Sequence, residues 1–410
     1  MAAEQAQTVR RRRVFYIPGY DPIHPRRYRE LYRKESAAQA EISGYDIRIA
    51  PRRGAARYGW GLEAEINGAE VEAEVEVLVW SDIVRNSMSN SIPATYWQLA
   101  RTAWTYIASG TLRRLMWLRK GPVIAALYPV GMLIFQLLIA LLLAWAAATI
   151  CVAVLAWIGL APLAGYALAL PVFVYALRWF RVKDNKLFAY YLMHDYAYSA
   201  QHGGANPPEL EARMSEFTDI IANALTDEGD EVLVVGHSSG AHLAVSILAD
   251  LMRAGRLPAN GPALSFLSLG QVVPMVSFLP KADRLRADLH YLSQCEQIAW
   301  VDVTAPGDGC AFALCDPVAV SGVAPETGQK GPLILSAAFT KTLKPETWAK
   351  LRWRFFRLHF QYLCAFDNPG DYDYFQITAG PLTLGARYKG RKPSQSRIDV
   401  AASRYTSMAA

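Results

Sequence analysis

The sequence is poor in cysteine and has none in a pattern that carries chemistry. Its five cysteines are an odd number in a chain of 410 residues, and no two of them have the CxxC spacing of common zinc and redox sites. We therefore expect neither a disulfide framework nor a zinc site, and a reducing compartment fits this composition best.

Charge is missing from one long stretch. No Asp, Glu, Lys or Arg occurs in residues 121–177, which are 57 positions. One bilayer crossing takes about 20 apolar residues, so this stretch is long enough for two crossings and a turn. We expect spans near residues 123–157 and 163–179, separated at Gly159 and Pro162, because Gly and Pro both disfavour helix continuation. The alternative is a helical hairpin buried in a soluble core, but core helices are far shorter.

Both flanks of this stretch are basic. The residues concerned are Arg113, Arg114, Arg119 and Lys120 before it, and Arg178, Arg181, Lys183 and Lys186 after it. The positive-inside rule then predicts a protein of the cell inner (plasma) membrane with two transmembrane helices, both termini and the remaining domain being cytoplasmic. Just before the first span, Trp97, Trp104, Tyr106 and Trp117 are mixed with arginines, which resembles an interfacial amphipathic segment.

The positive charge is distributed in a way that suits lipid rather than nucleic acid. The formal net charge of +6 is concentrated at residues 10–13, around the uncharged stretch and at residues 387–404. No basic stripe with interleaved stacking aromatics is present, so we expect a lipid membrane as partner and no nucleic acid.

Outside the uncharged stretch, strands and helices alternate. The sequence predicts strands at 14–17, 45–50, 61–66, 71–80, 231–235, 264–269 and 297–303, and helices at 25–42, 209–225, 240–254 and 347–364. This alternation predicts an α/β fold with a mainly parallel sheet and helices on both faces. We expect one domain made of residues 1–94 and 187–386, an inserted interfacial helix and transmembrane hairpin at 95–186, and a basic flexible tail at 387–410.

The strongest chemical motif is GHSSG at residues 236–240. The pattern G-x-S-x-G is weak alone, but here the apolar strand 231–235 precedes it and a helix follows at once. Small residues at both ends allow a sharp strand-to-helix turn, which exposes the central serine, Ser238, near a helix N-terminus. Ser239 is off centre, and the competing interpretation is a tightly packed turn without chemistry.

In these features the chain resembles the α/β-hydrolase superfamily, of the lipase or esterase kind. The resemblance covers the strands near Val14 and Val77 and most of residues 187–381. It implies a nucleophile, an acid and a histidine in that chain order. Only His359 lies beyond the plausible acids, so order selects it from the seven histidines, which are His24, His194, His202, His237, His242, His290 and His359. The helical pattern around His359 departs from the loop usual in that superfamily.

The acid should follow a strand after the nucleophile. Asp308 lies in the turn after the strand at 297–303, where a carboxylate can hold an imidazole in the correct tautomer. Asp302, inside that strand, and then Asp316 remain alternatives.

An oxyanion hole needs two N–H donors. The resemblance implies Ser239 as one, and Gly19 or Tyr20, in the loop after the first strand, as the other. His237 lines the site or packs locally. We expect no cofactor, and no metal, since the His194-Asp195 pair lacks partners at ligand spacing.

The resulting hypothesis is a membrane-associated serine hydrolase that cleaves acyl esters, with Ser238, His359 and Asp308 in an acyl-enzyme mechanism. Its location suggests an ester or lipid-like substrate. Two alternatives stay open: an acyltransferase with the same nucleophile, and a non-catalytic membrane scaffold with a hydrolase fold.

Overall fold

The computed structural model describes residues 8–52, 57–88 and 91–409, which form two units. The first unit holds the described residues up to Arg85, together with 109–122 and those from 202 onward, and the second unit holds 86–108 and 123–201 as far as they are described. The second unit is close to the insertion expected at 95–186. It differs in starting earlier, in ending later, and in leaving residues 109–122 to the first unit.

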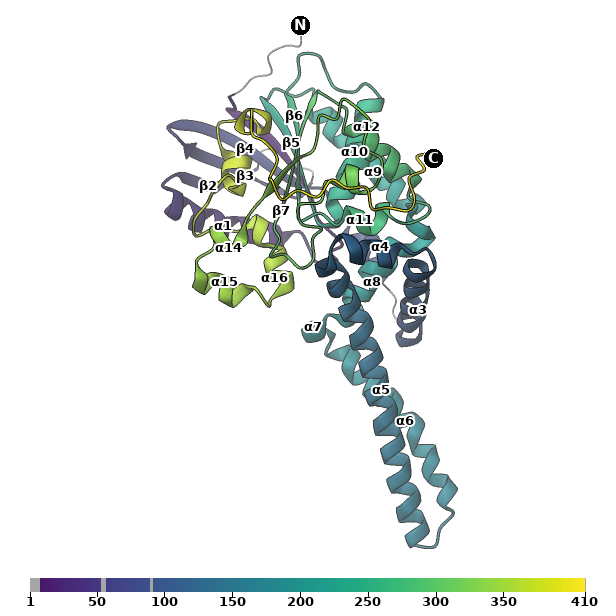
Figure 1. The fold of residues 1–410 in the computed structure, drawn as a ribbon. Helices are drawn as coiled ribbons and strands as arrows, with labels where there is room; N and C mark the ends of the chain where they lie inside the picture. Colours follow the sequence, from purple (N-terminus) through teal and green to yellow (C-terminus); the bar gives the residue numbers. More distant parts are fainter. Residues whose placement is uncertain (1–7, 53–56, 89–90, 410) are drawn as a thin grey trace. The chain divides into compact units, whose positions relative to one another are not determined.

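The first unit is built on a mixed, mostly parallel sheet of eight strands (Figure 1). Its spatial order is β2-β3-β4-β1-β5-β6-β7-β8. The bounds are β1 Arg11–Ile17, β2 Asp46–Ala50, β3 Gly59–Ile66, β4 Ala69–Val77, β5 Glu231–His237, β6 Ala263–Leu269, β7 Ile298–Thr304 and β8 Leu333–Ser336. The strands β2, β3 and β4 pair antiparallel, and the pairs from β4 across to β8 are parallel. The expected α/β fold with a mainly parallel sheet is confirmed, although β8 was not foreseen.

Local sequence explains the sheet. Asn67 and Gly68 both have positive φ, 56° and 74°, as a tight hairpin turn between β3 and β4 requires. All seven residues of β5, and likewise of β6, are buried, which is why apolar residues predominate in both strands without a period-two alternation.

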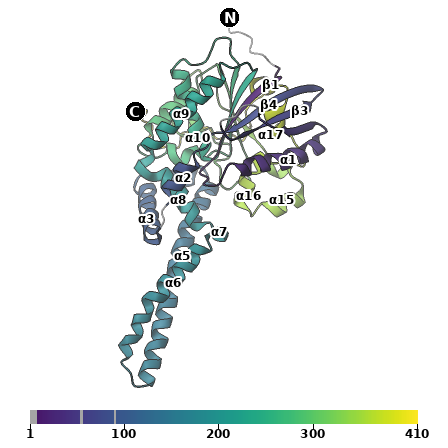
Figure 2. The ribbon, with the colours of Figure 1, turned by 180° about the vertical axis from the view of Figure 1, so that it is seen from behind.

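Helices cover both faces of the sheet (Figures 1 and 2). One face packs against α1 (Arg26–Ser43), α16 (Phe355–His359), η3 (Gln361–Leu363), α17 (Tyr374–Ala379) and α18 (Leu384–Arg387). The other carries α10 (Ser239–Arg253), which contacts α9 (Pro208–Ala224) and α12 (Asp283–Leu292). The other helices that lie wholly or mostly in the first unit are short: α2 Ser81–Ser87, α4 Thr111–Leu118, η2 Gln201–Gly204, α11 Val273–Ser277, α13 Pro317–Val320, α14 Phe339–Thr342 and α15 Pro345–Leu351.

The connections define a switch point in the middle of the sheet. After β1 the chain builds β2, β3 and β4 on one side, and after β5 it builds β6, β7 and β8 on the other, while β1 and β5 lie next to each other. In open α/β sheets, ligands bind at the carboxyl ends of strands at such a point. The edge where β1 and β5 end is therefore the place to look for a site.

The second unit contains two helices that are long and apolar enough to cross a membrane. They are α5 (Lys120–Trp157) and the pair formed by η1 (Pro162–Leu168) and α6 (Ala169–Val182). Gly159, with a φ of 72°, lies in the break between them, as expected. Most of each apolar segment is exposed, with 17% of its residues buried, unlike a core helix of a soluble protein.

Small residues pack these two segments together. Ala140, Ala144 and Ala148 are buried at four-residue spacing on one face of α5, and Ala140 packs against Leu177 of α6. A Cβ at Gly165 of η1 would lie 2.5 Å from the Val152 nitrogen, so the backbones approach closely there. Gly165 lies opposite Val152 and Leu177 lies opposite Ala140. By the same offset, the end of α6 at Val182 lies level with about residue 135 of α5, and the part of α5 before that residue continues beyond α6.

That first part of α5 packs against two other helices of the same unit. These are α3 (Ile92–Ala108) and α8 (Ala189–Ala200), which follows α7 (Asp184–Leu187). The Tyr96 hydroxyl of α3 donates to the Leu133 carbonyl of α5 at 2.9 Å. The aromatic segment predicted before the spans is amphipathic here, because Trp97 and Trp104 are exposed while Tyr106 is buried.

Two expectations about the C-terminal third are wrong. Residues 347–364 are not one helix: α15, α16 and η3 are separate short pieces, and Pro345 begins the first of them. The tail is not loose over its described part. The N–H groups of Ser394, Ile398 and Ala402 donate to carbonyls of Ile334, Leu314 and Val320 at 2.9, 2.7 and 3.0 Å.

Candidate active site

Ser238 lies at the turn between β5 and α10. Its φ of 57° and ψ of −122° are strained for a residue with a side chain, a state that costs about 1–3 kcal/mol and is typical of functional positions. The flanking glycines make this turn possible. A Cβ at Gly236 would lie 2.7 Å from the Gly240 carbonyl oxygen, and one at Gly240 would lie 2.1 Å from that of Ile17. The GHSSG pattern thus has a steric explanation at both ends.

The loop after β1 approaches the Ser238 side chain. A Cβ at Gly19 would lie 3.0 Å from the Ser238 Cβ and 3.3 Å from its Oγ. The Trp80 indole N–H donates to the Pro18 carbonyl at 2.9 Å and fixes this loop. Ser239 is the first residue of α10, so its N–H has no carbonyl four residues earlier within the helix. Gly19 and Ser239, whose N–H groups are two of the predicted oxyanion donors, therefore both lie beside Ser238. The Tyr20 N–H stays a predicted alternative to that of Gly19, and the Tyr20 hydroxyl donates to the Val84 carbonyl at 3.5 Å.

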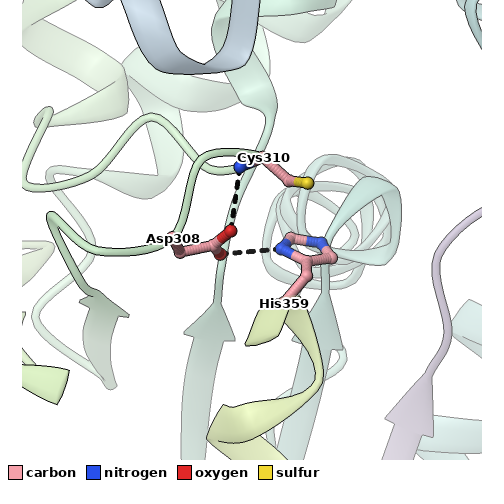
Figure 3. A group of neighbouring side chains, drawn as sticks. All are labelled: Asp308, Cys310 and His359. Atoms are coloured by element: carbon pink, nitrogen blue, oxygen red, sulfur yellow. Dashed lines mark hydrogen bonds and ion pairs between the residues drawn. The ribbon is translucent and has the colours of Figure 1, made fainter. Parts of the chain in front are cut away.

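Asp308 and His359 form a buried hydrogen-bonded pair. His359 Nδ1 lies 2.7 Å from Asp308 Oδ2, and the Cys310 N–H donates to the other carboxylate oxygen at 2.8 Å (Figure 3). Asp308 follows β7 in a turn, and His359 ends α16, so two segments far apart in sequence supply the pair. Because Nδ1 faces a carboxylate, it carries the proton and leaves Nε2 as the basic nitrogen.

A third side chain that the sequence analysis missed completes this arrangement. The Tyr362 hydroxyl donates to Asp308 Oδ2 at 3.0 Å and accepts from the Ala305 N–H at 3.0 Å. Burial acts to raise the Asp308 pKa, but the His359 charge and the hydrogen bonds from His359, Cys310 and Tyr362 outweigh it and lower that pKa from its usual value. The carboxylate thus stays charged. The available signal was the three-residue spacing of His359 and Tyr362, which places both on one side of a helical turn.

The other imidazole nitrogen of His359 is unoccupied. Nε2 is buried and has no hydrogen-bond partner among the described residues, so Ser238 Oγ does not bond to it in this conformation. The two groups nevertheless approach the same residues: the Ser238 N–H donates to the Leu269 carbonyl at 2.9 Å, and a Cβ on the adjacent Gly270 would lie 3.1 Å from His359 Cε1. In apo structures such catalytic hydrogen bonds are often unformed and close only around substrate.

His237 is hydrogen-bonded to the backbone of His359. Its Nε2 donates to the His359 carbonyl at 3.0 Å, and the two rings lie 4.9 Å apart between centroids. Burial, together with the nearby His359, lowers the His237 pKa to about 3, so this ring is neutral. It is a positioning residue that fixes the backbone carrying His359.

The alternative acids lie elsewhere. Asp302 is buried within β7, where it accepts from the Ser268 hydroxyl at 2.6 Å, and burial raises its pKa to about 8. Asp316 accepts from the N–H groups at the start of α13 and from the Gln329 amide at 3.0 Å. Neither makes a hydrogen bond to a histidine among the described residues. Of the seven histidines, His359 is the one with a carboxylate ion pair in the part of the chain that the structure describes.

One group of side chains has the composition of a metal site. Asp308, Cys310 and His359 offer ligand atoms within 4.8 Å of one another, and they form the only such group among residues 8–52, 57–88 and 91–409 (Figure 3). Asp308 and His359 already satisfy each other by hydrogen bonding. The acid–histidine pair therefore explains this cluster without an ion.

Comparisons with known proteins give no relative to guide the interpretation. No family model matches the sequence, and no curated protein and no solved structure matches it either. Any statement of function must therefore be argued from the chain itself.

Proposed function

We propose that this chain is a membrane-anchored serine hydrolase that cleaves acyl esters with Ser238, His359 and Asp308. The proposal includes the predicted resemblance to α/β-hydrolases, of the lipase or esterase kind. The observation that carries it is the Asp308–His359 hydrogen bond of 2.7 Å, which leaves a buried, unpaired Nε2 at the sheet edge where the strained Ser238 lies.

The proposed chemistry proceeds in two balanced steps. Ser238 Oγ attacks the ester carbonyl carbon while His359 Nε2 takes the hydroxyl proton, and the carbonyl oxygen becomes an oxyanion facing the N–H groups of Gly19 and Ser239. The carbon–oxygen bond to the alcohol then breaks as His359 returns the proton to the leaving oxygen. Water repeats the sequence on the acyl-enzyme and releases the carboxylic acid.

Each supporting residue has a defined part in this proposal. Asp308 holds the tautomer and stabilises the transient imidazolium. Tyr362 and the Cys310 N–H hold Asp308. An acyltransferase would share every step up to the acyl-enzyme and differ only in the acceptor.

The membrane part of the proposal rests on the two apolar helices and their flanks. The α5 helix has 38 residues, or about 57 Å at 1.5 Å per residue, whereas a bilayer core is about 30 Å thick. Since α6 ends level with about residue 135 of α5, the bilayer would take the paired part, and the first part of α5 would stand outside it with α3 and α8. The basic flanks on both sides support a cytoplasmic location for both termini and the proposed hydrolase unit under the positive-inside rule.

Labelling with a fluorophosphonate tests the nucleophile. The protein in membranes should react at Ser238, and Ser238→Ala should abolish both labelling and ester hydrolysis, while Ser239→Ala retains labelling. Persistent labelling of the Ser238→Ala protein would refute the mechanism. Full loss of activity with an unchanged elution volume and unfolding temperature would exclude misfolding as the cause.

A further inference from the structure

A run of five exposed residues lies immediately before the catalytic histidine segment. Residues 352–356 have the sequence RWRFF, and Trp353, Phe355 and Phe356 are 73%, 47% and 37% exposed. Elsewhere among the described residues of the first unit, large exposed apolar side chains occur singly along the chain. Scattered single residues need no explanation, but contiguous exposed aromatics mark a surface of interaction.

The charge around this run is strongly positive. Residues 341–357 contain six Lys or Arg and one carboxylate, Glu346. The Arg352 guanidinium lies 5.5 Å from the centre of the Trp353 ring, and neither Arg352 nor Arg354 has an ion-pair partner among the described residues. Aromatic rings interleaved with free cations suit the boundary between acyl chains and anionic head groups.

Residues 352–356 also lie next to the segments that carry the proposed acid and base. A Cβ at Gly309, the residue after Asp308, would lie 3.2 Å from the Phe355 ring of this run. Trp348, which lies outside the run, is near the other side of the same turn, where a Cβ at Gly307 would lie 2.6 Å from its ring. His359 follows in the same helix as Phe355. Phe355 therefore lies beside the turn that carries the acid and in the same helix as the base.

We propose that residues 352–356, the docking segment, bind an anionic lipid bilayer and bring the catalytic unit to acyl esters held in that bilayer. This inference rests on the proposed function, since it names the substrate class for Ser238. The occupant is a lipid surface because Arg352 and Arg354 have no ion-pair partner among the described residues and exposed aromatic side chains lie next to them in the chain.

Hydrogen exchange on the full chain in nanodiscs tests the docking directly. In phosphatidylcholine discs that contain phosphatidylglycerol, amides of the docking segment should be protected relative to pure phosphatidylcholine discs, and high salt should remove the difference. The variant R352Q/R354Q should lose this protection. The matched control K389Q/K392Q removes two exposed cations elsewhere and should keep it. Equal exchange in both lipids, or an unaltered R352Q/R354Q protein, would overturn the proposal.

Two activity measurements give the functional consequence. Arg352 and Arg354 should each contribute to the free energy of binding an anionic surface. The loss of both charges in R352Q/R354Q should therefore lower hydrolysis of a bilayer-embedded ester about 30-fold. Reaction with a water-soluble fluorophosphonate should change less than about threefold, because the catalytic groups are untouched. A parallel fall in both rates would instead indicate damage to the site and contradict docking.

The two proposals can fail separately. If Ser238→Ala retains labelling, the hydrolase proposal falls whatever the exchange data show. If labelling depends on Ser238 but the docking segment shows no lipid-dependent protection, docking alone is refuted. Protection by a soluble acidic protein but not by anionic discs would assign the segment to a protein partner and would also refute it.

Discussion

Two aspartates of the same strand-and-turn segment differ in charge because of their surroundings. Asp308 accepts three hydrogen bonds and faces an imidazole, so its pKa is lowered despite burial. Asp302 has one hydroxyl donor within the sheet, and burial raises its pKa to about 8. Only the first is suited to stabilise a charged histidine.

This contrast gives a paired test of the acid. Asp308→Asn should lower kcat by about 10⁴ with little change in KM, because the amide favours the wrong histidine tautomer. Asp302→Asn replaces an acid that is already neutral at pH 7, so activity should stay within about threefold. Steady-state kinetics on a soluble ester compares the two proteins. The reverse ranking would move the acid role to Asp302.

Asp302 should also make stability depend on pH. A carboxyl whose pKa rises from about 3.9 unfolded to about 8 folded binds more protons when folded, so its contribution is fully present below about pH 4 and is lost as pH rises towards 8. The upper bound on this loss is about 6 kcal/mol. Denaturant unfolding at pH 5, 6.5 and 8 should show a smaller decline for Asp302→Asn than for the parent. Equal slopes would show that Asp302 is not the titrating group.

At the scale of elements, the site depends on glycines that let strands and helices approach. Gly270, which follows β6 with a φ of 53°, faces His359 and Tyr362. A Cβ there would lie 2.7 Å from Tyr362 Cε2, so one methyl group would displace the turn that carries the base.

Gly270→Ala should therefore reduce activity about 100-fold through misplacement of His359. Gly44→Ala is the matched control, since Gly44 has a similar φ of 70° but no atom within 4 Å of its Cβ position. Both variants carry the same kind of backbone strain. If the two variants have the same unfolding temperature, a lower kcat for Gly270→Ala than for Gly44→Ala reports the displacement of His359 alone. Equal kcat values for both variants would contradict it.

The sequence was sufficient for those elements whose signal is local. Periodicity predicted the β1 strand and the α1 helix. The Asn67-Gly68 pair predicted the β3–β4 hairpin, and the spacing of Gly236 and Gly240 predicted the strand-to-helix turn at Ser238. The chain order implied by the resemblance selected His359, and the turn after the predicted strand at 297–303 favoured Asp308 over Asp302 and Asp316. The structure brings Asp308 and His359 together.

Long-range contacts account for what was missed. The β8 strand is only four residues, too short for a clear period, and is recognisable through its pairing with β7. The apolar pattern of 347–364 extends over three short pieces, α15, α16 and η3, and the breaks between them are not visible in that pattern. The three-residue spacing places Tyr362 near His359, but the hydrogen bond from Tyr362 to Asp308 joins residues 54 positions apart and cannot be predicted from that spacing.

At the scale of the whole molecule, the proposed topology is testable by labelling. A single cysteine replacing Leu160, in the break between the two spans, should react with an impermeant maleimide added outside cells. One replacing Ser407 should react only after lysis, since both termini are proposed to be cytoplasmic. Each variant would be made in a protein without its native cysteines. Labelling of position 407 in intact cells would invert the topology.

The adjacency of β1 and β5 couples the assembly of the site to the order of synthesis. Residues 11–17 pair with residues 231–236, and both apolar helices are encoded between them. At about 5–20 residues per second, a ribosome makes the complete hairpin several seconds before it releases β5. The hairpin can thus enter the membrane while the sheet still lacks its central strand. Under the proposed function, the nucleophile Ser238 is therefore translated only after the hairpin that would anchor it.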